Sequence, residues 1–127
     1  MEIELEVLVQ TFRAEAEEGL GHMEEALVAL EDSPSDKRLL QTIFRVAHTL
    51  KGNAATLGYS GVTEFAHRVE DWLDCILKGN AQVDSYRISC LLNSVDAIRS
   101  LIADSVSGSI EMKEVHRDAL ARLEASF

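Results

Sequence analysis

A histidine, a lysine and a glycine lie at spacing i, i+3 and i+4 in the stretch FRVAHTLKGNAATLG, which runs from Phe44 to Gly58. They are His48, Lys51 and Gly52, and this spacing places all three on one side of a helix. A histidine can attack phosphorus when one ring nitrogen is free and the other is held by an acceptor. A cation one turn away can offset the charge on the phosphoryl oxygens. The trio therefore indicates a phosphoryl-accepting histidine, with Lys51 supplying charge and Gly52 leaving the imidazole accessible.

The acceptor for the second ring nitrogen is expected on the following helix. A polar row recurs there at helical spacing and consists of Thr63, His67, Glu70 and Asp74. The two helices are joined by about three residues, so they should be antiparallel neighbours. Positions equidistant from the turn then face each other, which brings Glu70 and His67 level with the helix of His48. Glu70 is the predicted acceptor that orients His48, and His67 is predicted to support the network.

Sustained helical periodicity and a single proline predict an all-α chain. The first amphipathic helix should end near Asp32, because Ser33-Pro34-Ser35 cannot continue it. Ser35 or Asp36 can cap the second helix, which should end near Gly58.

Glycine-containing segments mark the remaining boundaries. The third helix follows Tyr59-Ser60-Gly61 and is closed by Lys78-Gly79-Asn80, and the fourth runs from about Asp84 to Ser107-Gly108-Ser109. A fifth helix is expected from Ser109 or Ile110 to the end. The predicted fold is an antiparallel four-helix bundle with an additional fifth C-terminal helix.

A chain of 127 residues is expected to form one domain, residues 1–127, with a single core. No apolar run approaches the roughly 20 residues that a membrane span requires. The acidic start lacks the pattern of a signal peptide, and Cys75 and Cys90 are interpreted as reduced core thiols. These features predict a cytoplasmic protein without membrane insertion.

The net charge of −10 argues against nucleic acid and anionic membranes as partners. The charge is unevenly distributed, because residues 1–32 hold ten acids and one base, whereas residues 36–57 hold one acid and four bases. The segment around His48 is therefore locally basic. It is either a solvated helix face or a surface suited to an anion or an acidic partner.

Other chemistries fit the sequence less well. Glu64 and His67 form a Glu-x-x-His pair, which di-iron bundles use twice with two further glutamates, but here it occurs once. No cysteine or serine lies in a recognisable nucleophile motif, and no glycine-rich phosphate loop follows a strand. We therefore predict no metal site and no ATP site in the chain itself. His22 and His116 lack companions and are interpreted as surface or boundary residues.

The stretch IFRVAHTLKGNAATLGYSGVTEFAHRVEDWLD resembles histidine phosphotransfer (HPt) domains. It is most similar to the amino-terminal phosphotransfer domain of chemotaxis histidine kinases of the CheA type. The signature HxLKG with a later H-x-x-E carries the resemblance, and the acidic first helix and the five-helix plan extend it over nearly the whole chain. Two positions depart from the CheA pattern: Asn53 stands where another glycine is common, and Thr49 replaces a common serine.

This resemblance implies that His48 is the phosphorylated histidine, that Glu70 hydrogen-bonds its other nitrogen, and that Lys51 and His67 complete the network. The implied partners are a histidine kinase catalytic domain, which holds the ATP and Mg²⁺, and the receiver domain of a response regulator. The expected function is that of a phosphorelay carrier in two-component signalling of the chemotaxis type. Two alternatives are a free-standing HPt protein of another phosphorelay and a helical bundle that only binds proteins.

Overall fold

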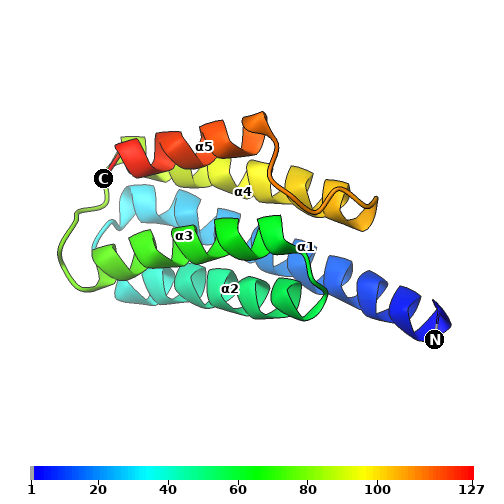
Figure 1. Ribbon diagram of the computed structural model, residues 1–127. Coiled ribbons are helices and arrows are strands. Elements are labelled where there is room, and N and C mark those ends of the chain that lie inside the picture. The colour runs from blue at the N-terminus through cyan, green and yellow to red at the C-terminus, as the bar shows by residue number, and fades with distance from the viewer. Residues whose placement is uncertain (1) are drawn as a thin grey trace.

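The computed structural model describes residues 2–127, which form five helices and no strand (Figure 1). The helices are α1 (Glu2–Asp32), α2 (Lys37–Thr56), α3 (Ser60–Leu77), α4 (Ser85–Val106) and α5 (Glu114–Ala125). The predicted all-α class, with four long helices followed by a shorter one, is confirmed.

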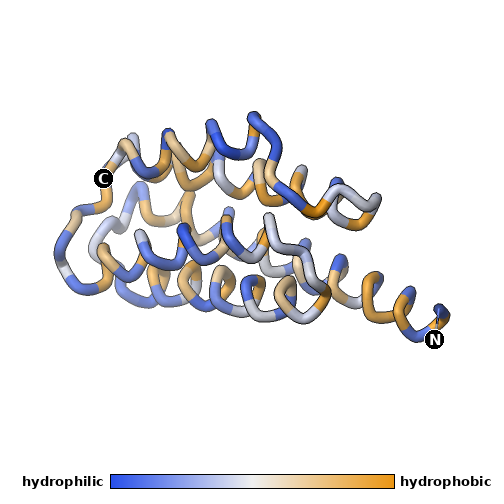
Figure 2. The backbone as a smooth tube through the Cα atoms, viewed as in Figure 1, coloured by the Kyte–Doolittle hydropathy of each residue, from blue (hydrophilic) through white to orange (hydrophobic). Residues whose placement is uncertain are grey.

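Four antiparallel helices make up the bundle, and the fifth lies on its outside (Figure 1). α2 packs between α1 and α3, α4 packs against α1 and α3, and α5 lies along α4 with a smaller contact to α3. Apolar and polar residues alternate along each helix, as amphipathic helices require (Figure 2). Every helix contributes at least one fully buried side chain to the shared core, among them Leu27, Ile43, Phe65, Ile98 and Leu123. Burial of each such side chain stabilises the fold by about 1.5–3 kcal/mol.

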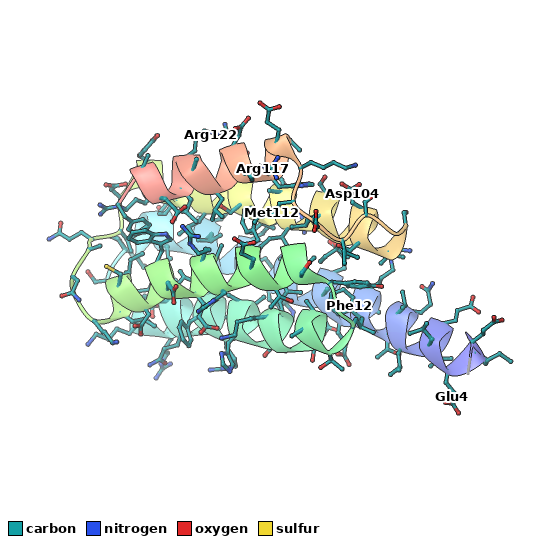
Figure 3. All side chains as sticks on the ribbon, in the orientation of Figure 1. Glu4, Phe12, Asp104, Met112, Arg117 and Arg122 are labelled. Carbon is teal, nitrogen blue, oxygen red and sulfur yellow. The ribbon has the colours of Figure 1, made fainter. Side chains whose placement is uncertain are left out.

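α1 extends beyond the other helices at its N-terminal end (Figures 1 and 3). Phe12 is its first buried residue, and its ring meets that of Tyr59 edge to face with centroids 5.6 Å apart. Glu4, labelled in Figure 3, lies on the protruding part. No helix in residues 2–127 is both long enough and apolar enough to cross a membrane.

Side-chain caps fix where α2 and α4 begin. The carboxylate of Asp36 accepts the backbone N–H groups of Arg38 and Leu39 at 2.9 and 3.4 Å, so Asp36 rather than Ser35 caps α2. Asp84 caps α4 in the same way, accepting the N–H of Arg87 at 2.7 Å. Each carboxylate satisfies N–H groups that have no partner within the helix.

A glycine in the left-handed conformation ends α2 and sets the turn to α3. Gly58 has φ +75°, its N–H donates to the carbonyl of Ala55 at 3.1 Å, and the N–H of Tyr59 donates to that of Ala54 at 3.0 Å. This is a Schellman motif, and only glycine adopts its conformation without strain. The predicted three-residue connection between α2 and α3 is therefore confirmed, and it makes the two helices antiparallel neighbours.

The prediction that the fifth helix begins at Ser109 or Ile110 is wrong, since α5 begins at Glu114. The carbonyl of Ile110 accepts the N–H of Gly61 at 2.8 Å, at the start of α3. A Cβ on residue 61 would lie 2.6 Å from that carbonyl oxygen. The segment before α5 therefore covers the N-terminal end of α3. The helix α5 starts after this contact.

The interpretation of His116 as a surface or boundary residue is also wrong, because this side chain is fully buried. Its Nδ1 accepts the backbone N–H of Lys113 at 3.0 Å, so the ring is neutral with its proton on Nε2. Nε2 lies 3.0 Å from the hydroxyl oxygen of Ser100 on α4. Burial lowers the pKa of His116, although the charge of nearby Asp104 opposes this. His116 thus caps α5 and ties it to α4.

Replacing Gly61 with alanine tests the contact between α3 and the segment before α5. The added Cβ would push against backbone atoms of residues 110–112, which cannot swing aside as a flexible side chain would. We expect a thermal unfolding midpoint lower by about 3–10 °C. The matched control is Gly21→Ala in α1, where a Cβ would meet nothing within 4 Å and should stabilise the helix by about 0.5–1 kcal/mol. Equal midpoints for the two variants would contradict the proposed close contact.

Candidate functional site

His48 and Glu70 meet across the seam between α2 and α3. Nδ1 of His48 lies 2.9 Å from Oε2 of Glu70. The imidazole is largely exposed, with 62% of the side chain accessible, whereas the Glu70 side chain is 13% accessible. The sequence-based prediction that the two side chains are brought together agrees with this geometry. An accessible ring is thus held by a partner that is mostly buried.

The hydrogen bond fixes which ring nitrogen is available for chemistry. An ionised carboxylate can only accept hydrogen bonds, so Nδ1 must carry the proton that Glu70 binds. Nε2 then keeps its lone pair, and within residues 2–127 nothing is hydrogen-bonded to it. The neutral tautomer with a free Nε2 is the one that can act as a nucleophile.

Lys51 binds the second oxygen of the same carboxylate. Its Nζ donates to Oε1 of Glu70 at 3.0 Å, and its side chain is 26% accessible. Burial raises the pKa of Glu70, but the hydrogen bonds from Lys51 and His48 and their charges lower it, and the net pKa lies below its ordinary value. Glu70 therefore stays ionised as an acceptor. The role predicted for Lys51, offsetting phosphoryl charge, stays a prediction, because its ammonium is paired with Glu70.

Gly52 follows His48 by one turn on the exposed side of α2. A Cβ built at this position would meet nothing within 4 Å. Packing therefore does not require a glycine here, although glycine within a helix costs about 1 kcal/mol relative to alanine. Open space beside the imidazole is consistent with the predicted role in access, which stays a prediction.

His67 lies on α3 but is not joined to the His48–Glu70 pair. Its Nε2 lies 3.6 Å from Oδ1 of Asp71, four residues further along the same helix, and both side chains are more than half exposed. The predicted supporting role of His67 stays a prediction. The i, i+4 spacing of His67 and Asp71 was a signal for this pair that the sequence reasoning did not use.

Phe44 is a contact of His48 that the sequence reasoning missed. Its ring is nearly parallel to the imidazole, with an interplanar angle of 8° and centroids 6.2 Å apart. The spacing i, i+4 was a signal for this pair. Phe44 also belongs to the apolar stripe of α2 and packs against the core, which by itself accounts for an aromatic residue at this position.

The structure offers little support for the rival chemistries. In residues 2–127 no three His, Cys, Asp or Glu side chains are grouped so that they could hold a metal ion. Ser100, His116 and Asp104 lie together, as in a hydrolase triad. However, the serine and the aspartate both approach Nε2, while Nδ1 accepts a backbone N–H. A triad needs the acid at the other ring nitrogen, so this cluster cannot activate Ser100.

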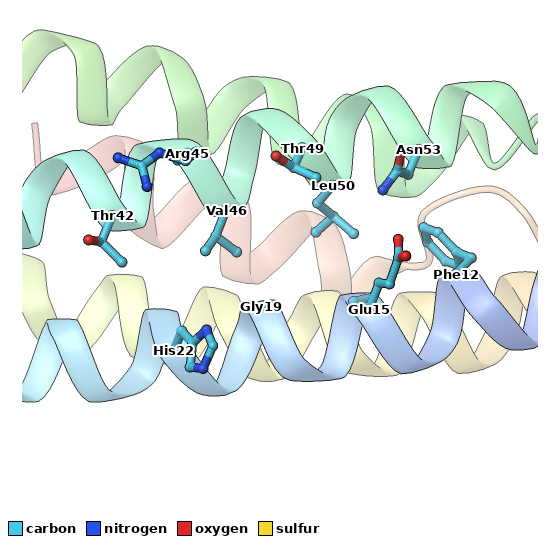
Figure 4. Close-up of a pocket in the computed structure, with 11 residues that line it drawn as sticks. Phe12, Glu15, Gly19, His22, Thr42, Arg45, Val46, Thr49, Leu50 and Asn53 are labelled. Atoms are coloured by element: carbon cyan, nitrogen blue, oxygen red, sulfur yellow. The ribbon is translucent and has the colours of Figure 1, made fainter.

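A hollow of about 250 Å³ lies between α1 and α2, on the flank of α2 that faces away from α3 (Figure 4). Its floor is apolar and its rim includes Glu15 and His22 of α1 and Arg45 of α2. Thr49 and Asn53, the two positions that depart from the CheA pattern, also line it. These departures therefore lie outside the contacts that orient His48.

Comparison with known proteins identifies the family of the chain. A family model described as "Hpt domain" matches residues 7–101. The chemotaxis protein CheA of Treponema pallidum is 35% identical over 120 residues, which is 94% of this chain and 15% of that protein. CheA of Borreliella burgdorferi is 33% identical over 115 residues, 91% of this chain and 13% of that protein. The chain thus spans about one seventh of the length of these relatives.

Two solved structures share the fold. One is the CheA phosphotransferase domain of Thermotoga maritima, with 31% identity and a TM-score of 0.74 over 80% of this chain and 96% of that one. The other is the phosphorylated P1 domain of CheA3 of R. sphaeroides in complex with CheY6, with 22% identity and a TM-score of 0.84 over 94% of each chain. Since the family model covers three quarters of the sequence, and since relatives at 33–35% identity match more than nine tenths of the chain, the chain belongs to the Hpt domain family.

Proposed function

We propose that this chain is a phosphorelay carrier of chemotaxis-type two-component signalling. In this proposal His48 accepts a phosphoryl group from a histidine kinase and passes it to an aspartate of a response regulator. The observation that carries the proposal is the hydrogen bond from Nδ1 of His48 to Glu70, which leaves Nε2 as an exposed nucleophile. The similarity to CheA proteins, and to a phosphorylated P1 domain solved with CheY6, supports the choice of pathway.

In the first step the lone pair of Nε2 forms a bond to the γ-phosphorus of ATP. The bond from that phosphorus to its bridging oxygen breaks, and ADP leaves with the electron pair. The proton on Nδ1 stays in place, so the phosphorylated ring gains positive charge. The carboxylate of Glu70, 2.9 Å from Nδ1, offsets this charge. Glu70 therefore stabilises the phosphorylated form as well as selecting the reactive tautomer.

In the second step a carboxylate oxygen of the regulator attacks the same phosphorus. The bond between phosphorus and Nε2 breaks, and its electrons return to Nε2 as a lone pair. His48 is regenerated in its neutral form with the proton still on Nδ1. Because neither step consumes a group of this chain, the same site can load and unload repeatedly.

The partners follow from this chemistry. The chain's own residues suggest no ATP site, so we assign ATP and Mg²⁺ to the kinase catalytic domain. The bases of α2 lie in the segment that carries His48, and they suit a receiver domain whose phosphorylation pocket is acidic. We place the reaction in the cytoplasm, where kinase and regulator would both be available.

Replacing His48 tests the function directly. The purified chain is incubated with radiolabelled ATP and a CheA kinase that lacks its own phosphotransfer segment. We expect an acid-labile, base-stable label on the wild type and background labelling of His48→Gln, because glutamine has no nucleophilic nitrogen. The control His22→Gln changes an exposed histidine of α1 and should label as the wild type does. A wild type that takes up no label would instead favour a bundle that only binds proteins.

Replacing Glu70 tests whether its charge stabilises the phosphorylated imidazole. Glu70→Gln keeps the size of the side chain and its acceptor oxygen, but it removes the charge that offsets the phosphorylated imidazole. Loss of a charged hydrogen-bond partner typically costs about 1.5–3 kcal/mol, so labelling should slow by roughly 10- to 150-fold. The measurement is the initial rate of label uptake by folded protein. Labelling at the wild-type rate would show that Glu70 does not act on His48 chemistry.

Variants of Gly52 test the access argument. Gly52→Ala adds a Cβ in open space and should raise helix stability by up to about 1 kcal/mol with little change in labelling. Gly52→Leu places a longer side chain that leans back toward the imidazole, and it should slow labelling severalfold. Gln41→Leu, at an exposed position of the same helix, is the control for added apolar surface. Equal labelling rates for Gly52→Leu and Gln41→Leu would show that Gly52 has no role in access to His48.

A further inference from the structure

Phe44 supports the imidazole of His48 from one side. The two rings are stacked, with an interplanar angle of 8° and a centroid separation of 6.2 Å, within the range typical of offset aromatic pairs. Phe44 is itself partly buried and packs against the hydrophobic core. The Phe44 ring is thus anchored in the bundle and lies parallel to the exposed imidazole. An anchored ring can restrain a ring that would otherwise move freely in solvent.

Helix geometry explains why this support is one-sided. Side chains on a helix lean toward the N-terminus, so His48 lies over the turn that carries Phe44. The residue that would lean over His48 in the same way is residue 52, which is a glycine with open space around it. The imidazole therefore has the Phe44 ring beside it on its N-terminal side and open space on the side of Gly52.

The hydrogen bond to Glu70 alone does not fix the plane of the ring. A single bond at Nδ1 still leaves some freedom in the side-chain torsions χ1 and χ2, and that motion would sweep Nε2 through an arc. The stack on Phe44 opposes this motion, because turning the ring would break the parallel contact. Two restraints of different kind, one polar and one apolar, therefore act on the same side chain.

We infer that Phe44 is a positioning residue for phosphoryl transfer, which holds the plane of His48 so that Nε2 keeps one direction. This inference rests on the proposed function of His48. A nucleophile held near its attack geometry reacts faster than one that must find it. The phosphorus approaches along the ring plane, where the Nε2 lone pair lies, and the bulk of the donor or acceptor is accommodated on the open side over Gly52.

Three variants test the inference. Phe44→Leu keeps an apolar side chain at the position but removes the aromatic face, and Phe44→Tyr keeps the face. The matched control is Leu39→Ala, a partly buried apolar residue of the same helix that packs against the core. Thermal unfolding is recorded for each variant, and Phe44→Met replaces Phe44→Leu if the latter does not fold.

The kinetic readout is labelling by the CheA kinase and ATP as the concentration of the chain is varied. We expect Phe44→Leu to lower kcat by about two- to tenfold with KM unchanged, as the typical strength of an aromatic pair implies. Phe44→Tyr should restore the wild-type kcat, and Leu39→Ala should lower the unfolding midpoint without lowering kcat. A wild-type kcat in Phe44→Leu, or an equal loss in Leu39→Ala, would overturn the inference.

A spectroscopic readout separates this inference from the proposed function. In the NMR spectrum, the stack should shift the ring protons of His48 upfield, and the ¹⁵N signals of its ring should report a proton held on Nδ1. In Phe44→Leu the upfield shift should disappear and the tautomer ratio should move toward that of free histidine. If the wild type shows these signals but takes up no phosphoryl group, the proposed function fails while the restraint by Phe44 stands. Unchanged ring signals in Phe44→Leu would reject the restraint itself.

Discussion

The carboxylate of Glu70 is the group on which the site depends. Its two oxygens bind two different side chains of α2, one from His48 and one from Lys51, at 2.9 and 3.0 Å. The carboxylate lies mostly out of solvent, where an unpaired charge would be costly. Hydrogen bonds from both partners lower its pKa, so it stays ionised although burial opposes this. The same contacts therefore hold α2 to α3, keep Glu70 charged, and select the tautomer of His48.

This arrangement depends in turn on the connection between α2 and α3. His48 and Glu70 lie equally far along the chain from Tyr59, which sits in the turn. Gly58 closes α2 in the left-handed conformation, and the N–H of Tyr59 completes the motif. A longer or looser connection would let the helices slide, and a shift by one residue would turn Glu70 away from the imidazole. The backbone conformation at Gly58, far from His48 along the helix, thus sets the geometry at the ring.

Most of the site could be predicted because it depends on local spacing. Helical periodicity placed His48, Lys51 and Gly52 on one side of α2, and the short turn brought Glu70 level with them. What the sequence could not show depends on contacts between distant segments. The segment before α5 is held by a hydrogen bond from the N–H of Gly61 to the carbonyl of Ile110. The burial of His116 likewise depends on Ser100 of a different helix. Periodicity within one helix does not indicate contacts between segments that are distant in the sequence.

Residues that serve two purposes are also difficult to predict from the sequence. Phe44 belongs to the apolar stripe of α2, and packing against the core is sufficient reason for its presence. The stripe therefore gives no separate sign of its contact with His48. Under the proposed function this double use has a physical advantage. A carrier needs its nucleophile at the surface, where partners can reach it, but exposed side chains are mobile. Here the mobility is limited from beneath, by a carboxylate and an aromatic ring that the bundle itself holds in place. The reactive nitrogen can therefore remain accessible to kinase and regulator, while contacts with residues anchored in the bundle fix its direction.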